Sequence, residues 1–211
     1  MGLRLNLGCG PGLISSNYSN YDSSRKLFAT KVIEILKINK IIEWNSDWDT
    51  SVKYRNVCKL NFTENSVDEV YSSHLLEHLY LDQALKLISD IYIWLRPGGR
   101  LRIVLPDYDH FIDSYIADRE KKDSQAIENF RLNLVSFPAQ KPNIGKSILR
   151  FLKASENHQH KWYPTKSYLF NILKESGFSS ILQYKYRDGN LKDLDLIETR
   201  DTASFYIECV K

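Results

Sequence analysis

Cysteine and long apolar runs are both scarce in this sequence, and each shortage excludes a class of protein. The chain has 211 residues and only three cysteines, Cys9, Cys58 and Cys209. An odd number of scattered cysteines argues against a disulfide framework and against a zinc site built from thiolates. No apolar run approaches the roughly 20 residues that a membrane-spanning helix requires. The sequence therefore predicts neither a disulfide-rich secreted domain nor a membrane-spanning protein.

The sequence also lacks a strong net charge and a targeting segment. The formal net charge is +3, and the densest charge run, residues 118–123 (DREKKD), mixes both signs. Nucleic-acid binding is therefore not indicated, because such proteins usually carry a clustered positive patch. The first ten residues hold no apolar segment of the signal-peptide kind, and Asn6 stands where a myristoylation signal needs Ser or Thr. We expect a cytoplasmic protein, and the oligomeric state stays open, with a homodimer as one option.

What the sequence does contain is a regular alternation of strand-like and helix-like segments. Strands are expected at residues 3–7, 18–21, 53–57, 67–72, 100–105, 181–186 and 204–210. Helices are expected at residues 25–38, between the fourth strand and residue 95, and at 165–176. Ser24 and Thr165 can cap two of these helices, and the RPGG run at 96–99 is a helix stop signal.

This order of elements predicts an α/β fold of the Rossmann-like, doubly wound kind, with a mostly parallel seven-stranded sheet. The last two strands have no helix between them in the expected order, so we expect an antiparallel C-terminal strand pair at one edge of the sheet. The whole chain, 1–211, is expected to form a single domain. A charge-rich stretch, helical over about 109–135, follows strand five. We interpret residues 107–163 as an insertion that covers the acceptor side of the active face.

A glycine-rich turn, LNLGCGPG at residues 5–12, follows the first strand at once. Gly8 and Gly10 can adopt a positive φ and let the backbone approach a ligand closely, because they carry no Cβ. The spacing departs from the Gly-x-Gly-x-x-Gly of dinucleotide sites, and Pro11 removes one N–H that could hold a phosphate. Asp22, at the end of the second strand, is placed to accept hydrogen bonds from both hydroxyls of a ribose. A tight turn without a ligand and a surface Asp are the alternatives.

Five landmarks occur in order along the chain: LNLGCG (5–10), Asp22, NSVDEVYSSHLLEHL (65–79), LRPGGRLRIVLPD (95–107) and SFYIECVK (204–211). Together they resemble the methyltransferase type 11 group of class I S-adenosylmethionine-dependent enzymes. The chain looks closest to small bacterial members often associated with polysaccharide and glycan synthesis. The resemblance is dense over residues 3–107 and thinner over 158–178.

The resemblance implies S-adenosylmethionine as the cofactor and assigns parts of it to residues of this chain. Gly8, Cys9 and Gly10 would line the methionine part, and Asp22 would hold the ribose. Because this cofactor carries its own leaving group, methyl transfer is an in-line displacement that depends mainly on positioning. A base is needed only where the acceptor must lose a proton.

The adenine and sulfonium contacts are the next residues that the resemblance implies. Asn56 or its neighbour Val57 stands where such families commonly place an Asp that receives the adenine amino group. Asn56 can still accept that hydrogen bond through its side-chain oxygen. Ser72, Ser73 and His74 would lie on the loop after strand four, beside the sulfonium.

The segment after strand four also holds Glu77 and His78. If it were helical, His74 and His78 would share a face as an i,i+4 pair and could act as metal ligands or proton carriers. The chain lacks the Glu-x-x-His arrangement of metalloproteases here, so no metal is predicted. We favour a structural role for His78 and a cofactor contact for His74.

Three residues are candidates for a catalytic base. Asp107 directly follows strand five and could take a proton, or it could be a turn carboxylate at the start of the next helix. His158 and His160 precede Trp162 in a segment (157–162) that the resemblance places near the acceptor, and histidine accepts a proton near neutral pH. No third metal ligand can be identified beside this pair, and Trp162 is interpreted as a core aromatic.

The favoured function is methyl transfer to a small-molecule or glycan acceptor, at a hydroxyl oxygen. An RNA or protein methyltransferase is the second hypothesis and would need a basic stripe at the mouth of the cofactor site. A non-catalytic binding module with the same fold is the third, supported by Asn56 in place of an acid. A nucleotide-binding oxidoreductase is disfavoured, because the third fingerprint glycine is not at the required spacing.

Overall fold

The structure is a computed structural model that describes residues 2–37, 47–134, 160–201 and 203–211. Within these ranges the strands form one seven-stranded sheet in the order β3-β2-β1-β4-β5-β7-β6. The strands are β1 (Leu3–Leu7), β2 (Ser19–Asp22), β3 (Lys53–Tyr54), β4 (Val67–Ser73), β5 (Leu95–Pro106), β6 (Ser179–Tyr184) and β7 (Ser204–Val210). Strands β1 to β5 are parallel to one another, and β7 is antiparallel to both β5 and β6. The predicted mostly parallel, Rossmann-like sheet with an antiparallel C-terminal strand is therefore confirmed.

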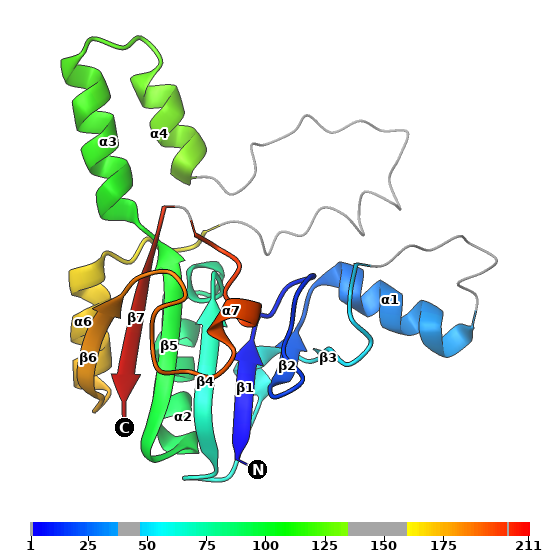
Figure 1. Ribbon diagram of the computed structural model, residues 1–211. Helices are drawn as coiled ribbons and strands as arrows, with labels where there is room; N and C mark the ends of the chain where they lie inside the picture. Colours follow the sequence, from blue (N-terminus) through cyan, green and yellow to red (C-terminus); the bar gives the residue numbers. More distant parts are fainter. Residues whose placement is uncertain (1, 38–46, 135–159, 202) are drawn as a thin grey trace.

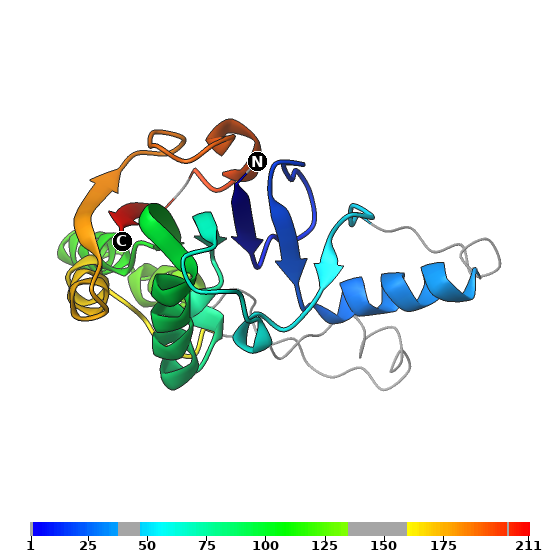
Figure 2. The ribbon, with the colours of Figure 1, turned by 90° about the horizontal axis from the view of Figure 1, so that it is seen from below.

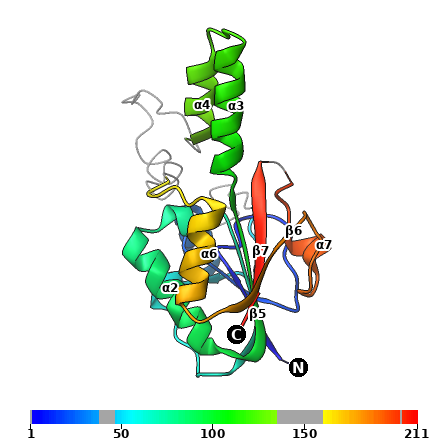
Figure 3. The same cartoon turned by 90° about the vertical axis from the view of Figure 1, so that its left-hand side faces the viewer.

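Helices cover the sheet on two sides. They are α1 (Arg25–Leu36), α2 (Leu81–Trp94), α3 (Tyr108–Glu120), α4 (Ala126–Leu134), α6 (Lys166–Glu175) and α7 (Leu194–Ile197), with short 3-10 turns η1 (Val57–Lys59) and η2 (Leu76–His78). Helices α2 and α6 lie on one face and α7 on the other (Figure 3). Helix α1 lies beside β2 and β3, away from α2 and α6 (Figure 2). Helices α3 and α4 extend beyond the carboxyl end of β5 (Figure 1).

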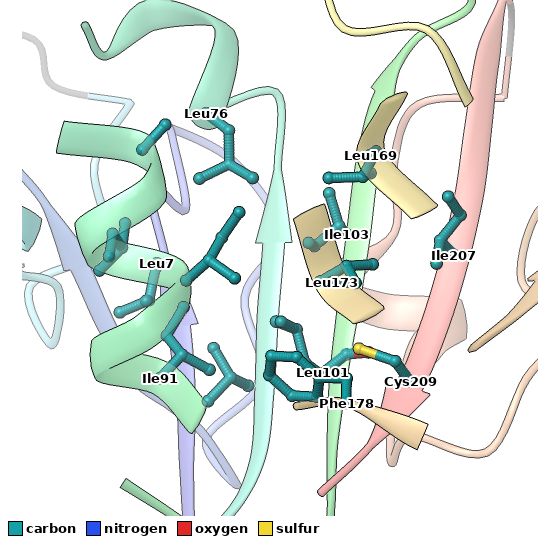
Figure 4. Close-up of a cluster of buried hydrophobic side chains, with 14 of the residues drawn as sticks. Leu7, Leu76, Ile91, Leu101, Ile103, Leu169, Leu173, Phe178, Ile207 and Cys209 are labelled. Carbon is teal, nitrogen blue, oxygen red and sulfur yellow. The ribbon is translucent and has the colours of Figure 1, made fainter. Parts of the chain in front are cut away.

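The core follows the two-residue period of the strands. On β5, Leu101 and Ile103 belong to the cluster under α2 and α6, whereas Val104 belongs to the cluster under α7. Figure 4 shows Leu101 and Ile103 among the α6 side chains Leu169 and Leu173. The alternation arises because successive side chains of a strand point to opposite faces of the sheet. One face of the sheet therefore packs against α2 and α6, and the other packs against α7.

The helix caps expected from the sequence are present. The Ser24 side chain accepts a hydrogen bond from the Leu27 amide at the start of α1, at 3.2 Å. Thr165 does the same for the Tyr168 amide at the start of α6, at 3.3 Å. Such caps satisfy an amide that has no partner inside the helix. Within the described ranges no helix is both long enough and apolar enough to cross a membrane.

Four local expectations were wrong in detail. Strand β3 has two residues, because Asn56 turns the chain into η1. The segment after β4 is not one helix, since His74 has a φ of 48° and α2 begins only at Leu81. The RPGG run ends α2 but lies inside β5, where Gly98 and Gly99 pair with Lys211. Helix α7 intervenes between β6 and β7, where no helix was expected, although the two strands do pair antiparallel at one edge of the sheet.

Candidate functional site

The glycine-rich turn leaves β1 at the carboxyl edge of the sheet. The Gly8 and Cys9 amides both donate to the Tyr21 carbonyl, at 2.9 and 3.2 Å, which joins the turn to β2. Gly8 has a φ of 69° and Gly10 a φ of 63°, the left-handed region that favours glycine. A Cβ at Gly8 would lie 2.9 Å from the Leu75 side chain, whereas one at Gly10 would meet nothing within 4 Å. Gly8 is therefore required by packing, and Gly10 leaves space at the surface of the turn.

Asp22 fastens the same turn from the end of β2. One carboxylate oxygen accepts from the Gly10 amide at 3.1 Å and the other from the Ser24 amide at 2.7 Å. Because each carboxylate oxygen offers about two acceptor positions, Asp22 keeps the capacity to accept further donors, such as ribose hydroxyls. Burial raises the pKa of the Cys9 thiol to about 12, and the nearby Asp22 charge adds to this shift. Cys9 is therefore a neutral thiol at physiological pH and not a nucleophile.

The residues proposed for the adenine lie at the end of β3. The Arg55 amide donates to the Asp22 carbonyl at 2.9 Å, so this segment borders the Asp22 turn. The Asn56 side-chain oxygen accepts from the Cys58 amide at 2.9 Å as the cap of η1. Val57 is buried, with 3% of its side chain exposed. Asn56 thus has one of its two acceptor positions in use, and its contact with adenine stays a prediction.

A cavity of about 520 Å³ lies beside β3 and is a separate feature. It is lined by Tyr21, Lys31, Thr50, Lys53, Phe62 and neighbouring residues. None of the residues predicted to bind the cofactor lines it. The glycine-rich turn and Asp22 are the better candidate, because ligands of open α/β sheets bind at the carboxyl ends of the strands.

The loop after β4 faces the glycine-rich turn through Leu75. The His74 amide donates to the Val104 carbonyl at 2.9 Å, and its ring Nε2 lies 3.1 Å from the Ser204 hydroxyl. Its Nδ1 lies 3.3 Å from Glu77 Oε1. Ser73 ends β4 and pairs with Val104 across the sheet. His74 therefore stands at the predicted edge, but as an anchored turn residue and not as a member of a helical face.

Asp107 has the capping role that the sequence left as an alternative. Helix α3 begins directly after it, and one carboxylate oxygen accepts from the His110 amide at 3.2 Å. The other oxygen forms an ion pair with Lys166 at 2.8 Å. Both oxygens are thus engaged, so a role as base would require Asp107 to exchange one of these contacts.

His160 and Trp162 contact the start of α3 and the 3-10 turn η2. The Trp162 indole N–H donates to the Leu76 carbonyl at 2.7 Å, and its ring is buried in the core, as expected. His160 Nδ1 lies 2.9 Å from the Tyr108 hydroxyl. Burial lowers the pKa of His160, although the nearby Glu77 charge opposes the shift. His158 lies outside the described residues.

The structure brings together three side chains that the sequence did not connect. Ligand atoms of Glu77, His78 and His160 all lie within 4.8 Å of one another. The sequence offered the adjacent Glu77-His78 pair and the later His160, but the two parts are more than 80 positions apart. A contact over such a separation depends on the fold and leaves no local pattern.

The comparisons with known proteins agree with this geometry. Residues 5–103 match a family model described as a methyltransferase domain. An S-adenosylmethionine-dependent methyltransferase from Mesorhizobium loti is 18% identical, with a TM-score of 0.50, and the match covers 99% of this chain and 90% of that one. The apo form of the S-adenosylmethionine-dependent methyltransferase SibL is 15% identical, with a TM-score of 0.51 and coverage of 100% and 50%. A search of curated proteins finds no significant match.

At these identities the structural likeness shows the fold, and the family match defines the class. The fold is that of class I methyltransferases, and the matched residues 5–103, just under half of the chain, form a methyltransferase domain. More narrowly, it is an S-adenosylmethionine-dependent enzyme with a domain of the methyltransferase type 11 family. S-adenosylmethionine is accordingly its cofactor.

Proposed function

We propose that the enzyme transfers the methyl group of S-adenosylmethionine to a hydroxyl oxygen of a small-molecule or glycan acceptor. The observation that carries the proposal is the convergence of two segments at one sheet edge. The Gly8–Gly10 turn and Asp22 form the cofactor side. The loop after β4 and the segment around His160 form the acceptor side and bring several proton-accepting groups.

On the cofactor side, Gly8, Cys9 and Gly10 hold the methionine part and Asp22 binds the ribose hydroxyls. Charge-assisted hydrogen bonds of this kind are stronger than neutral ones. Asn56 and Val57 border the adenine, and Ser73 and His74 face the sulfonium in this assignment. Segment 107–163 covers the acceptor.

A hydroxyl acceptor is supported by the number of histidine and carboxylate groups near the transfer point. A hydroxyl must lose its proton during transfer, and a base supplies about 10²–10⁴-fold of rate in such reactions. His160 and Asp107 are the candidate bases in the described structure, and His158 is a further one from the sequence. Half-exposed Tyr163, edge-on to Tyr108, offers a ring on which a sugar face can pack.

The chain accordingly takes part in polysaccharide or glycan synthesis in the cytoplasm under this proposal. Its mixed surface charge supports a small or glycan acceptor over RNA, since the formal net charge is only +3. For the oligomeric state, the proposal names a homodimer as one option.

The first test is calorimetric titration with S-adenosylmethionine and S-adenosylhomocysteine. Asp22→Ala removes the carboxylate beside the turn and is expected to weaken binding at least about tenfold, or about 1.4 kcal/mol. Asp195→Ala is the matched control. It removes an exposed carboxylate of α7, on the sheet face opposite α2 and α6, and should bind as the wild type does. Equal cofactor affinities for both variants would show that Asp22 does not contribute to cofactor binding.

The second test concerns the acceptor. Transfer from methyl-labelled cofactor is measured with monosaccharides, oligosaccharides, an RNA pool and a peptide pool, followed by NMR of the labelled methyl group. The proposal predicts an O-methyl resonance on a sugar or another hydroxyl compound. Label in RNA or peptide, or an N-methyl product, would contradict the acceptor assignment and leave the methyltransferase class untouched.

A further inference from the structure

Glu77 is the most unusual residue of the acceptor side. Its side chain is fully buried, and neither carboxylate oxygen has a hydrogen-bond partner in the described part of the chain. Its ion-pair contacts there are two histidines, with His74 Nδ1 at 3.3 Å and His78 Nε2 at 4.0 Å. A buried carboxylate is costly unless a positive charge and hydrogen bonds compensate it. A cation bound among these groups would supply that charge.

His160 closes the cluster from the covering segment. The rings of His78 and His160 lie with their centroids 5.0 Å apart, and both present ligand atoms within 4.8 Å of the Glu77 carboxylate. A tetrahedral zinc ion with bonds of about 2.0–2.2 Å holds its ligand atoms somewhat closer together than this. We expect the two imidazoles to rotate toward Glu77 when a metal binds and so to close that difference.

The neighbours of His160 are those of a metal-binding histidine. Its Nδ1 lies 2.9 Å from the Tyr108 hydroxyl. A ligating histidine commonly donates its second N–H to such a partner, which fixes the ring. One ring nitrogen can thus turn to a metal while the other keeps a hydrogen bond.

Main-chain contacts hold the two halves of the cluster together. The Lys161 amide donates to the Glu77 carbonyl at 2.7 Å, and the Trp162 indole donates to the Leu76 carbonyl at 2.7 Å. The segment that carries His160 is therefore attached to the 3-10 turn that carries Glu77 and His78. Such support keeps ligands in place before a metal binds.

We propose that Glu77, His78 and His160 form a three-ligand site for a divalent transition metal, zinc first, with a fourth position open to the acceptor. Two histidines and one carboxylate with an open position are a ligand set of catalytic zinc sites. One zinc ion supplies the positive charge that the buried Glu77 lacks. The site lies beside the cofactor turn, because Leu75 in the same loop packs against Gly8.

The use of the metal rests on the proposed function, whereas metal binding itself does not. A hydroxyl bound at the open position would have a lowered pKa and would release its proton to water. The acceptor oxygen then bonds to the methyl carbon, the carbon–sulfur bond breaks, and the sulfur keeps the electron pair. Acceptor and cofactor thus give the methyl ether, S-adenosylhomocysteine and one proton.

The test is zinc affinity, measured with Zn²⁺ alone in competition with a chromogenic chelator. The wild type is expected to bind one zinc ion, and Glu77→Gln and His160→Gln to bind it at least about 100-fold more weakly. His110→Gln, an exposed histidine outside the cluster, and Cys58→Ser are controls that should keep wild-type affinity. Circular dichroism and cofactor binding establish that each variant is folded.

Tyr108→Phe keeps the ligands and removes one partner of His160. Loss of such a contact typically weakens metal binding about 10–100-fold, so this variant tests the site even if Glu77→Gln fails to fold. Co²⁺ in place of zinc should give the visible absorption of a four-coordinate ion, altered by an acceptor alcohol. Absence of stoichiometric zinc binding, or unchanged affinity in all three variants, would overturn the proposal. Hydroxyl methylation without zinc would overturn the proposed use of the metal and leave the proposed function standing. Zinc binding without hydroxyl methylation would support the site and contradict that function.

Discussion

Arg102 is the largest fully buried side chain of the described structure, and it joins β5 to the C-terminal part of the chain. Its guanidinium donates to both oxygens of Glu198 at 2.7 and 2.8 Å and to Glu208 at 3.0 Å. It also donates to the Lys185 and Asp188 carbonyls at 3.0 and 2.9 Å. Burial would lower the pKa of Arg102, but the two carboxylates reverse the shift and raise it.

Arg102→Met tests how much of the fold depends on this arrangement. The substitution leaves Glu198 and Glu208 buried, with 0% and 2% exposed, and without a counter-charge. Removing one partner of a buried ion pair typically costs about 3–5 kcal/mol, against a total stability of about 5–15 kcal/mol for a protein. At about 2–4 °C per kcal/mol for a chain of this size, Tm should fall by roughly 6–20 °C.

The measurement is urea unfolding, monitored by tryptophan fluorescence. Arg96→Met is the matched control, because Arg96 is half exposed and pairs with Asp68 at the surface, where such pairs contribute about 0–1 kcal/mol. Replacing Glu198 and Glu208 by Gln in the Arg102→Met background should restore part of the loss, since the uncompensated charges are removed. If Arg102→Met lowers the free energy of unfolding no more than Arg96→Met does, the argument that the buried ion pairs of Arg102 stabilise the fold is wrong.

Three further predictions concern the site. Gly10→Ala should lower the free energy of unfolding by about 1–2 kcal/mol because of its φ of 63°, and should also weaken cofactor binding in calorimetry; unchanged affinity would mean that the cofactor stays clear of Gly10. At pH 8 the Cys9 thiol, with its pKa raised from 9.0 to about 12, should react with a thiol reagent roughly 1,000-fold more slowly than after denaturation. The native state retains the Cys9 proton at pH values where the unfolded chain has lost it, so the free energy of unfolding should fall as pH rises from about 9 to about 12. Rapid modification of native Cys9, resolved by mass spectrometry, would contradict both statements. Asp107→Asn keeps an oxygen that caps α3 and should leave the transfer rate within about threefold, whereas a fall of about 100-fold or more would identify Asp107 as the base.

The elements that the sequence predicted well are those whose signals are local. Strand β7 has the expected ends, because residues 205–210 are apolar at every position except Glu208, which is typical of a strand buried on both faces. Helix α6 begins directly after its predicted N-cap, Thr165, and ends at Glu175, one residue before its expected end. The positions of Gly8 and Asp22 at one sheet edge also followed from sequence, since parallel strands place their carboxyl ends together.

The elements that the sequence missed depend on partners far along the chain. Strand β5 continues through Gly98 because Lys211 pairs with it. Helix α7 has only four residues and follows Asp193 in a left-handed conformation, with a φ of 56°, so no periodic pattern marks it. The left-handed turn at His74 likewise replaced the expected helix, and its anchors, Val104 and Ser204, come from other strands.

The two sides of the candidate site differ in how far similarity can assign them. The family match ends at residue 103 and includes the turn, Asp22 and the loop after β4. Asp107 and His160, which we propose for the acceptor side, lie beyond it. The cofactor side can therefore be inferred from likeness, because one cofactor imposes one set of contacts. The acceptor side has no such constraint, since function depends on the site and not on the fold. Its assignment depends on the chemistry of Glu77, His78 and His160, which zinc binding and product analysis measure directly.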